Sequence, residues 1–489
     1  MEQSLMLSMR RDKMVDLISA IDGMVCVWNA YFWRIAFVFL IGLGIVFTIK
    51  LKGIQIMHLG HNAKLALSGV GEGKGKKKLS SFEAFCISMG ARIGVGNIAG
   101  VATAIVTGGP GAVFWMWIFA IIGSASSFME SVLAQIYKEQ KTDGGYHGGP
   151  AYYATKGLGS RKLGIFVAML LVLTFGVGFV MVQSCNASNA LCGAFDFENN
   201  NIVFAVAIAA IASLLVFGGF KLIGKFSSTI VPIMALLWIV FAVIAMAFNA
   251  GNIGNAIGMI FAHAFDLPSI IGGGIGTIII TGLKRGVFSN EAGLGSIANV
   301  AATSDIKHPV KQGKIQSFGV LVDTLLVCTV TALVILSYGS FDAIMAFGDK
   351  GSVLVQDVIS STPLGEAANY IIAVFMFVFA FTSMIGYYTM SESNARFIKD
   401  SKVTVNLVRI IVIIAALVAA IIADVTIVDD ISDTFMAAMA SVNMVIVALL
   451  SRQVFEAYAD YRNQRKQGVE EPEFHKKTLS DSTGVTEWE

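Results

Sequence analysis

The sequence predicts an all-α polytopic membrane protein with about eleven transmembrane helices. Of its 489 residues, 55% are hydrophobic and only 14% are charged, a balance that a soluble domain with one core does not show. The apolar residues also gather into runs of about 20, the length of helix that crosses the hydrocarbon of a bilayer. The net charge of +2 is divided among separate loops, so nothing indicates a surface for nucleic acid.

Eleven apolar runs are long enough to span the bilayer, and the segment MEQSLMLSMRRDK precedes the first of them. This segment lacks the apolar core of a signal peptide, so we expect the first run to remain in the mature chain. The predicted spans lie near residues 27–49, 82–106, 111–136, 163–190, 202–220, 226–248, 269–301, 315–338, 366–391, 403–423 and 431–451.

The basic residues predict the orientation of these spans. Loops on one face of the membrane collect 26 Lys and Arg, whereas the opposite face collects 4. Because basic loops stay in the cytoplasm, the N-terminus is predicted to be extracellular and the C-terminus cytoplasmic. Residues 1–81 then hold the extracellular N-terminus, the first helix and a basic cytoplasmic loop. Residues 249–268 form an extracellular linker, and residues 452–489 form a polar cytoplasmic tail that we expect to be disordered.

Glycines interrupt two of the predicted spans. Gly90, Gly94 and Gly96 crowd the second span, and Gly282 and Gly286 crowd the seventh, where glycine costs a helix most stability. A helix broken inside hydrocarbon frees backbone groups that only protein or a wetted cavity can satisfy. The two interruptions therefore indicate broken helices around a site for a small ligand.

The two interruptions occupy matching places in the chain. Each opens a block of five spans, residues 82–248 and residues 269–451. Because five is odd, the second block runs opposite to the first, which is a 5+5 inverted repeat with the first helix as an addition. Close packing of small residues would explain either interruption alone. Their matching positions favour broken helices.

Polar residues beside the glycines suggest where the half-helices begin. Asn97 is predicted to be the N-cap of the outer half of the second span, and Ser289 or Asn290 that of the second half of the seventh. Glu291 would then lie in a first turn, where a carboxylate complements the helix dipole.

Four stretches give the chain a family resemblance. GGPGAVFWMWIFAIIG at 108–123 resembles a signature of the sodium:alanine symporter family. GVGNIAGVATAI at 94–105, HGGPAYY at 147–153 and GLKRGVFSNEAGLGS at 282–296 are similar to the same family, over about residues 80–400. The resemblance implies a LeuT-like fold and a secondary symporter that imports alanine or glycine with Na⁺ by alternating access. It also implies a multi-pass protein of the prokaryotic plasma (inner) membrane.

An amino-acid zwitterion needs donors for its carboxylate and acceptors for its ammonium. The N–H groups of Val95, Gly96 and Asn97, at a half-helix N-terminus, are the predicted donors. Carbonyls near Thr281 and Gly282, at the end of the other half-helix, are the predicted acceptors. Glycines here let the backbone approach closely, which is consistent with a small substrate.

Three further side chains are candidates for the substrate pocket. Gln183 and Asn186 are polar, lie within the fourth span and are three residues apart, so they share one helix face. Hydrogen bonding between helices would explain the same pair. Phe288 either gates or walls the pocket, or serves only in packing.

Neutral oxygens are the predicted ligands of Na⁺. The adjacent hydroxyls of Thr382 and Ser383 resemble the pair that completes the sodium site of LeuT-like transporters. The resemblance carries the remaining ligands onto the carbonyls of Gly90 and Ile93. In the alternative interpretation the two hydroxyls bond only to the preceding helical turn.

Charged residues within the spans are candidates for gates. Three cations can pair with three carboxylates, and the pairs would either break during transport or stay fixed. These residues are Arg92, Lys284, Arg285, Glu130, Glu291 and Asp323.

Three other function classes remain to be weighed against a Na⁺ symporter. Proton coupling would need a titrating group, for which Asp323 is the candidate. An enzyme would need a convergent catalytic or metal-ligating set, which the scattered His and Cys do not form. A channel fits paired broken helices less well. We therefore expect no enzyme, no organic cofactor, and three partners: a small neutral amino acid, Na⁺ and the lipid bilayer.

Overall fold

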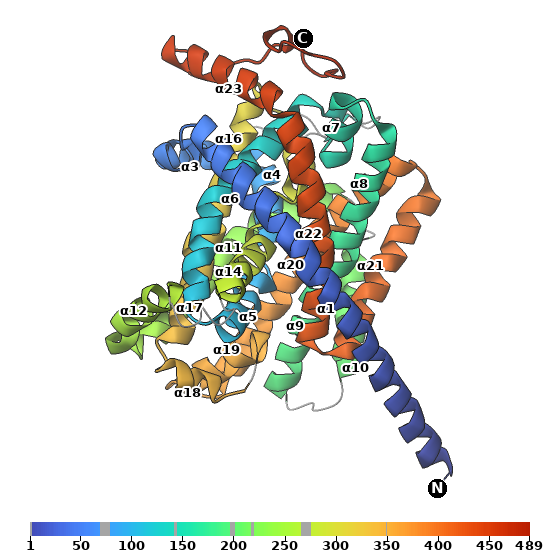
Figure 1. The fold of residues 1–489 in the computed structure, drawn as a ribbon, viewed down its shortest axis with the longest axis vertical. Helices are drawn as coiled ribbons and strands as arrows, with labels where there is room; N and C mark the ends of the chain where they lie inside the picture. The colour runs from blue at the N-terminus through green and yellow to red at the C-terminus, as the bar shows by residue number, and fades with distance from the viewer. Residues whose placement is uncertain are drawn as a thin grey trace.

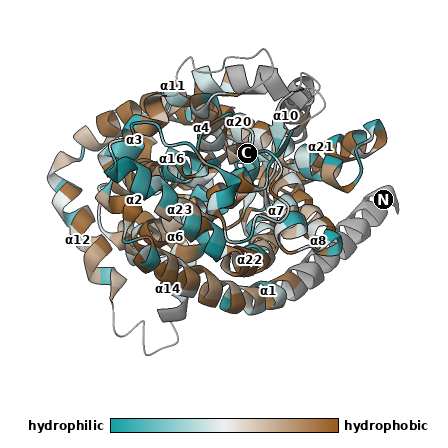
Figure 2. Ribbon diagram, turned by 90° about the horizontal axis from the view of Figure 1, so that it is seen from above, coloured by the Kyte–Doolittle hydropathy of each residue, from teal (hydrophilic) through white to brown (hydrophobic). Residues whose placement is uncertain are grey.

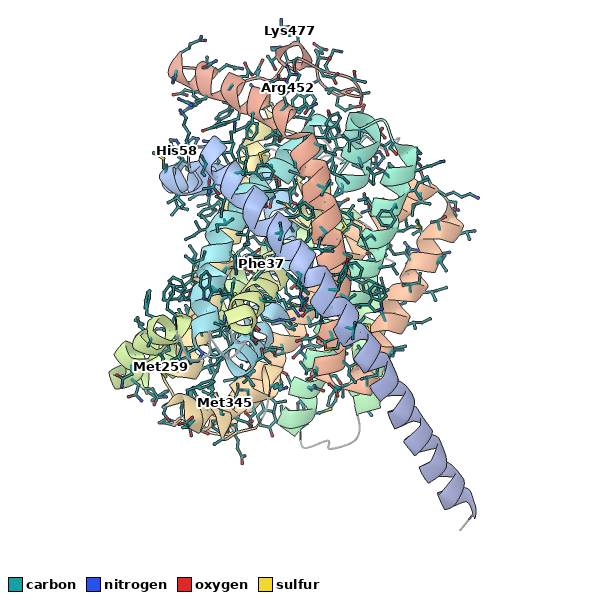
Figure 3. All side chains as sticks on the ribbon, viewed as in Figure 1. Phe37, His58, Met259, Met345, Arg452 and Lys477 are labelled. Atoms are coloured by element: carbon teal, nitrogen blue, oxygen red, sulfur yellow. The ribbon has the colours of Figure 1, made fainter. Side chains whose placement is uncertain are left out.

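The computed structural model describes residues 2–68, 79–140, 144–195, 201–216, 220–265, 275–348 and 350–489. Nearly all of these residues are helical, and the helices form one bundle whose side chains fill the space between them (Figures 1 and 3). Three parts of the sequence predictions lie outside the described residues: positions 69–78 of the basic loop, positions 217–219 of the fifth span, and positions 266–274, where the linker meets the seventh span.

The first half of the chain begins with one long helix and contains the only strands among the described residues, a two-stranded antiparallel pair. Its elements are α1 (Glu2–Lys50), α2 (Ile54–Met57), α3 (Leu59–Ser68), α4 (Ser81–Arg92), the 3₁₀ turn η1 (Val95–Asn97), α5 (Ala99–Gly108), α6 (Gly111–Ile136), β1 (Glu139–Gln140), β2 (Tyr146–His147), α7 (Pro150–Gly157), α8 (Arg161–Leu173), the π-helical segment η2 (Thr174–Phe179), α9 (Val180–Phe195), α10 (Asn201–Val216), α11 (Phe220–Ala247), η3 (Ala250–Asn252) and α12 (Ile253–Ala264).

The second half is helical throughout its described part. Its elements are α14 (Ile275–Asn290), α15 (Ser296–Ala301), α16 (Pro309–Leu321), the π-helical segment η5 (Val322–Cys328), α17 (Thr329–Leu336), α18 (Phe341–Met345), α19 (Gly351–Ser360), α20 (Ala367–Ile398), α21 (Lys402–Ile422), α22 (Val425–Leu449), α23 (Ser451–Lys466) and the 3₁₀ turn η6 (Lys476–Thr478).

Eight helical segments of the described chain are long and apolar enough to cross a membrane. Each coincides with a predicted span. The three predicted spans that remain are the 16-residue α10 and the two interrupted ones, which are α4 with α5 and α14 with α15. The view from above shows apolar residues on the outer surface of the bundle (Figure 2), as expected where helices face lipid.

The second span is broken near the predicted place. Ser80 and Glu83 form a capping box that starts α4, since each side chain accepts the other's backbone N–H. The helix ends at Arg92, and Gly94 is extended, with φ −132° and ψ −160°. The chain then passes through η1 into α5, so two short helices meet inside the bundle.

The seventh span breaks farther along the chain than predicted. Helix α14 runs without interruption through Gly282 and Gly286 and ends at Asn290. Three residues with positive φ make the break: Glu291 (57°), Gly293 (84°) and Gly295 (73°). Neither Ser289 nor Asn290 caps the next helix, because Gly295 occupies the N-cap position of α15. The predicted caps are therefore wrong.

The two ends of the chain lie at opposite ends of the bundle (Figure 1). Helix α1 crosses the outside of the bundle along α22 and α6. The C-terminal tail is ordered, so the prediction of disorder is wrong. Its first part is helix α23. Beyond α23, four apolar side chains of the tail are buried: Phe474, Leu479, Val485 and Trp488. The Trp488 indole donates to the Gln135 carbonyl over 2.9 Å. A few apolar residues spaced along a mostly polar tail therefore hold it against the bundle.

Candidate functional site

The first break places a glycine between two polar side chains from other helices. A Cβ added to Gly94 would lie 2.3 Å from Ser383 Oγ and 3.0 Å from Gln183 Oε1. Because real Cβ atoms do not approach so closely, only glycine fits here without displacing a neighbour. Gln183 on α9 also accepts the N–H of Val95 over 3.1 Å, so it meets one of the predicted backbone donors.

The break frees carbonyls at the end of α4, and hydroxyls from α20 reach them. Ser383 donates to the Gly90 carbonyl over 3.0 Å, and Tyr387 donates to the Ala91 carbonyl over 3.0 Å. Helix α20 thus presents two hydroxyls to the unwound end of α4. Ser383 lies where a hydroxyl and a backbone carbonyl can share a cation.

Thr382 behaves differently from its neighbour. Its hydroxyl lies 3.0 Å from the Phe379 carbonyl and 3.1 Å from the Val378 carbonyl, both in the preceding turn of α20. The alternative interpretation, local bonding, therefore describes Thr382, whereas Ser383 reaches across to α4.

Aromatic rings close the side of the break that faces α14. Phe288 lies 4.6 Å from Phe179 between ring centroids, and Phe179 lies 5.3 Å from Tyr387. A Cβ on Gly96 would lie 2.9 Å from Phe288 Cδ1, so the ring packs directly on the backbone of η1. Phe288 is thus a wall of the broken region, and little space is left beside it.

A buried carboxylate joins the two broken helices. Asp323 in η5 accepts from Asn97 Nδ2 over 2.7 Å and from Ser289 Oγ over 2.6 Å.

Asn97 does not cap α5, because Ile98 is the N-cap residue. The Asn97 side chain instead accepts the N–H of Gly94 over 2.9 Å, which fixes the turn at the break.

Three predicted substrate residues lie away from the break. Asn186 donates to the Val182 carbonyl of its own helix, and its Oδ1 packs against Gly351 at the start of α19. Thr281 and Gly282 lie inside the continuous α14, so their carbonyls are not at a helix end. A Cβ on Gly282 would lie 2.7 Å from the Ala112 carbonyl, which makes this glycine a close contact with α6. The structure contradicts the helix-end geometry predicted for Thr281 and Gly282.

Arg92 binds neutral oxygens in the described part of the chain, rather than the predicted carboxylates. Its guanidinium donates to the Asn290 carbonyl over 2.9 Å, to Gln316 over 3.2 Å and to the Ser127 hydroxyl over 3.0 Å. The Asn290 carbonyl belongs to the last turn of α14, where a cation also complements the helix dipole. Arg92 therefore ties the end of α4 to the end of α14.

Glu130 and Glu291 both form hydrogen bonds at the second break. Glu130 on α6 accepts the N–H of Gly295 over 2.9 Å and Asn443 Nδ2 over 3.0 Å. Glu291 accepts from the Ser296 hydroxyl over 2.5 Å. These carboxylates therefore bind the residues of the break instead of Arg92, Lys284 or Arg285.

Lys284 and Arg285 pair with acidic residues that sequence reasoning did not select. Arg285 binds Asp429 over 2.8 Å and also Asp433, and Lys284 Nζ lies 3.5 Å from Asp433. A signal was present in the sequence: Asp429 and Asp433 are four residues apart and share one face of α22. The pairs join α14 to the first turns of α22, at the opposite end of this helix from α23.

Comparison with known proteins identifies the family to which the chain belongs. The model of the sodium:alanine symporter family matches residues 18–476. The chain belongs to this family. It is 42% identical over 472 residues to the amino-acid carrier protein AlsT of Bacillus subtilis, which covers 96% of this chain and 98% of AlsT. It is also 42% identical over 469 residues to the probable sodium/glutamine symporter GlnT of Bacillus subtilis, covering 96% of each chain.

A solved structure extends the comparison to the fold. The crystal structure of MhsT in complex with L-phenylalanine matches with a TM-score of 0.56 and 13% identity, over 77% of this chain and 90% of MhsT. The predicted LeuT-like fold is confirmed. This member of the sodium:alanine symporter family is a multi-pass membrane transporter for Na⁺-coupled amino-acid symport, and that prediction is confirmed too.

Proposed function

We propose that this symporter imports alanine or glycine and binds the substrate at the first broken helix, between η1, Gln183 and Phe288. The observation that carries the proposal is the crowding of Gly94 by Ser383 and Gln183, because one backbone position then contacts both an ion ligand and a substrate ligand. The close packing of Phe288 on Gly96 favours a substrate with a very small side chain.

The substrate carboxylate binds the N–H groups of Val95 and Gly96, and that of Asn97 once it leaves the Gly94 carbonyl, to which it donates over 3.2 Å. The amide oxygen of Gln183 already accepts from Val95, and a carboxylate oxygen can take the same place. Carbonyls at the unwound end of α4 supply acceptors for the ammonium in place of those of Thr281 and Gly282. Asn186 acts from outside this pocket, through its contact with α19.

Na⁺ binds beside the substrate, at the carbonyls of Gly90 and Ile93 and the hydroxyl of Ser383. The 3.0 Å contact between Ser383 and Gly90 already brings two neutral oxygens together. Such oxygens suit an ion that must be released again on the other side of the membrane. Thr382 completes the site only if its hydroxyl turns away from its own helix.

Alternating access requires the contacts around both breaks to change. We assign Arg92, Glu130 and Glu291 to the gate on the side of α23, which we place in the cytoplasm, and Lys284 and Arg285 to the outer gate.

The repeats are residues 82–248 and 269–451, joined by the extracellular linker 249–268. Residues 1–81 precede the repeats with the N-terminus outside, and the tail 452–489 follows them in the cytoplasm of a prokaryotic cell.

Proton coupling is the second candidate, and it is favoured by one observation. Asp323 is fully buried and touches both broken helices through Asn97 and Ser289, so a change in its protonation would act on both. In that case Asp323 rather than Ser383 would bind the coupling ion.

Uptake into proteoliposomes tests the proposal. Radiolabelled alanine is offered under an inward Na⁺ gradient, a K⁺ gradient or a pH gradient, with unlabelled glycine and glutamine as competitors. Accumulation with Na⁺ alone, inhibited by glycine and not by glutamine, is the expected result. Accumulation with the pH gradient alone would replace Ser383 by Asp323 as the coupling site, and inhibition of alanine uptake by glutamine would refute the small pocket.

A further inference from the structure

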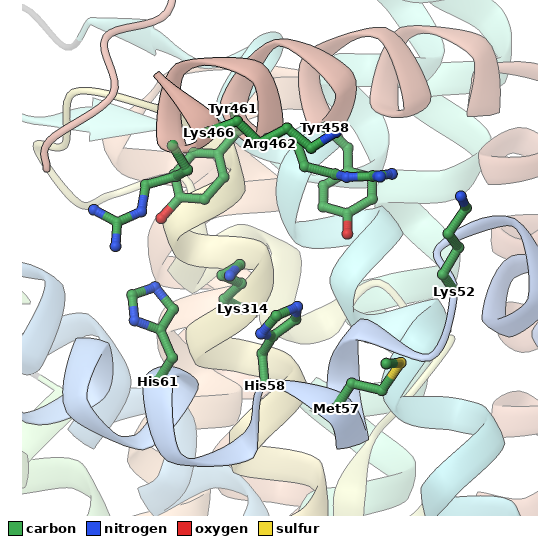
Figure 4. Close-up of a pocket in the computed structure, with 10 residues that line it drawn as sticks. Lys52, Met57, His58, His61, Lys314, Tyr458, Tyr461, Arg462 and Lys466 are labelled. Carbon is green, nitrogen blue, oxygen red and sulfur yellow. The ribbon is translucent and has the colours of Figure 1, made fainter. Parts of the chain in front are cut away.

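A basic pocket lies at the end of the bundle that carries α23, apart from the substrate site. It encloses about 590 Å³ between α23, the α2–α3 segment and α16. Figure 4 shows side chains from α23 and from α2–α3 pointing toward one another, with Lys314 between them. Seven of its ten lining residues are basic and none is acidic: Lys52, His58, His61, Lys314, Arg462, Arg465 and Lys466.

Lys314 is the cation at the back of this pocket. Its side chain is only 5% exposed, yet among the described residues no carboxylate pairs with it, and its Nζ lies over the Tyr461 ring at 5.2 Å. A buried ammonium without a counter-charge is costly, so an anion in the pocket would be strongly favoured.

Other cations at this end of the bundle have acidic partners. Lys307 lies 3.1 Å from both Glu471 and Glu473, and Lys156 lies 3.1 Å from Glu139. The chain thus supplies carboxylates to cations beside the pocket, whereas the described residues supply none inside it. This difference indicates a pocket that takes its negative charge from a ligand.

The histidines report the positive field of the pocket. Burial, together with the charges of Lys314, Arg465, His58 and Lys64, lowers the pKa of His61 to about 4. A bound anion would favour the imidazolium and raise this pKa. Anion binding therefore takes up a proton, and affinity for the anion should rise as the pH falls from neutral.

The surroundings of the pocket place it at the surface of a membrane. Lys52 follows directly on the membrane-spanning part of α1, which ends at Lys50. Met57, which lines the pocket, is 74% exposed, and Leu67, later in the same α2–α3 segment, is 62% exposed, although both are apolar. An exposed apolar face beside a basic cluster is typical of contact with anionic lipid.

We propose that this pocket binds a phosphate-bearing anion, with Lys314 and Arg465 on the phosphate. An anionic phospholipid headgroup would place its acyl chains along α2–α3, and a free phosphate compound would use the same cations. The inference concerns a second site and does not depend on the substrate of the transporter.

Thermal unfolding of the full-length protein in neutral detergent tests the proposal. Phosphatidylglycerol is compared with phosphatidylcholine, and inorganic pyrophosphate is added separately. Titration with each probe gives its affinity, which should fall about fivefold for each cation removed by Lys314→Gln or Arg465→Gln. Lys307→Gln, which removes the same charge outside the pocket, should leave the affinity unchanged. Should Lys314→Gln fail to fold, Arg462→Gln tests the side of the pocket that α23 forms.

Each outcome decides the question. Stabilisation by phosphatidylglycerol that the pocket variants lose identifies the lipid headgroup as the ligand. Stabilisation by pyrophosphate, again lost in these variants, identifies a free phosphate compound. Absence of stabilisation by either probe, or equal loss in Lys307→Gln, would overturn the proposal.

Discussion

Gly94→Ala is the sharpest perturbation of the proposed transport site. The added methyl carbon would lie 2.3 Å from Ser383 Oγ, and 3.4 Å is the short limit of an ordinary contact. Because real Cβ atoms do not approach closer than 3.0 Å, Ser383 Oγ must retreat by at least 0.7 Å, and by 1.1 Å to restore an ordinary contact. Its hydrogen bond to the Gly90 carbonyl, now 3.0 Å, cannot survive that movement.

The cost follows from two terms. A lost hydrogen bond costs about 0.5–1.5 kcal/mol and overpacking costs about 1–3 kcal/mol. A total of about 1.5–4.5 kcal/mol corresponds to a roughly 10- to 2,000-fold loss of apparent Na⁺ affinity. The backbone adds no strain, because φ of −132° at Gly94 is open to alanine.

The assay is the Na⁺ dependence of alanine uptake in proteoliposomes, with Gly100→Ala as the matched control. A Cβ on Gly100 would lie 3.9 Å from Phe288, an ordinary contact, so this variant should keep wild-type uptake. In the Gly94→Ala background, Ser383→Ala should cost little further, because the displaced hydroxyl is already lost. Wild-type Na⁺ activation in Gly94→Ala would refute the assignment of Ser383.

Three further substitutions test other parts of the molecule. Asp433→Asn leaves Arg285 with Asp429 as its remaining carboxylate partner. The free energy of unfolding should therefore fall by about 2–3 kcal/mol, less than the 3–5 kcal/mol that a fully broken buried pair costs. An unchanged temperature of thermal unfolding would contradict this. Asp323→Asn keeps the size of the side chain but turns a donor toward the donors around it, so uptake should fall at least about tenfold; uptake that loses only its pH dependence would instead support proton coupling. Trp488→Ala removes a buried anchor of the tail, and limited proteolysis should then cut beyond α23 in the variant but not in the wild type.

Much of the fold was predictable because membrane helices are specified by length and hydropathy. Each predicted span coincides with helix in the described residues, and the first break follows from three glycines within seven residues of sequence, Gly90 to Gly96. The second break was misplaced because glycine has two uses in a membrane helix. Gly282 serves close packing on α6, whereas the break itself needs the positive φ of Gly293 and Gly295.

The partners of charged residues were not predictable in the same way. Arg92 binds the Asn290 carbonyl and Gln316, which are 198 and 224 residues distant in sequence, and no local pattern reports such a contact. The hydropathy pattern also hid the partner of Arg285, because Asp429 lies just outside the predicted span 431–451 and so was not a candidate for pairing within the membrane. Ser383 was selected because its hydroxyl stands out in an apolar helix and because the family resemblance implies a role for it; the structure adds its contact with the Gly90 carbonyl, and its role toward Na⁺ stays a prediction.

The contacts of the first break explain how ion and substrate can be coupled. Ser383 and Gln183 both pack against Gly94, within 2.3 Å and 3.0 Å of the position of a Cβ, so neither can move toward this residue without displacing it. In the proposed site, an ion held by Ser383 and the Gly90 carbonyl would also hold the backbone that presents the Val95 N–H to a substrate carboxylate. Coupling of this kind is reciprocal: whatever factor Na⁺ adds to substrate affinity, substrate must add to Na⁺ affinity. Since Asp323 links the same turn to Ser289 on α14, the occupied site acts on both broken helices together.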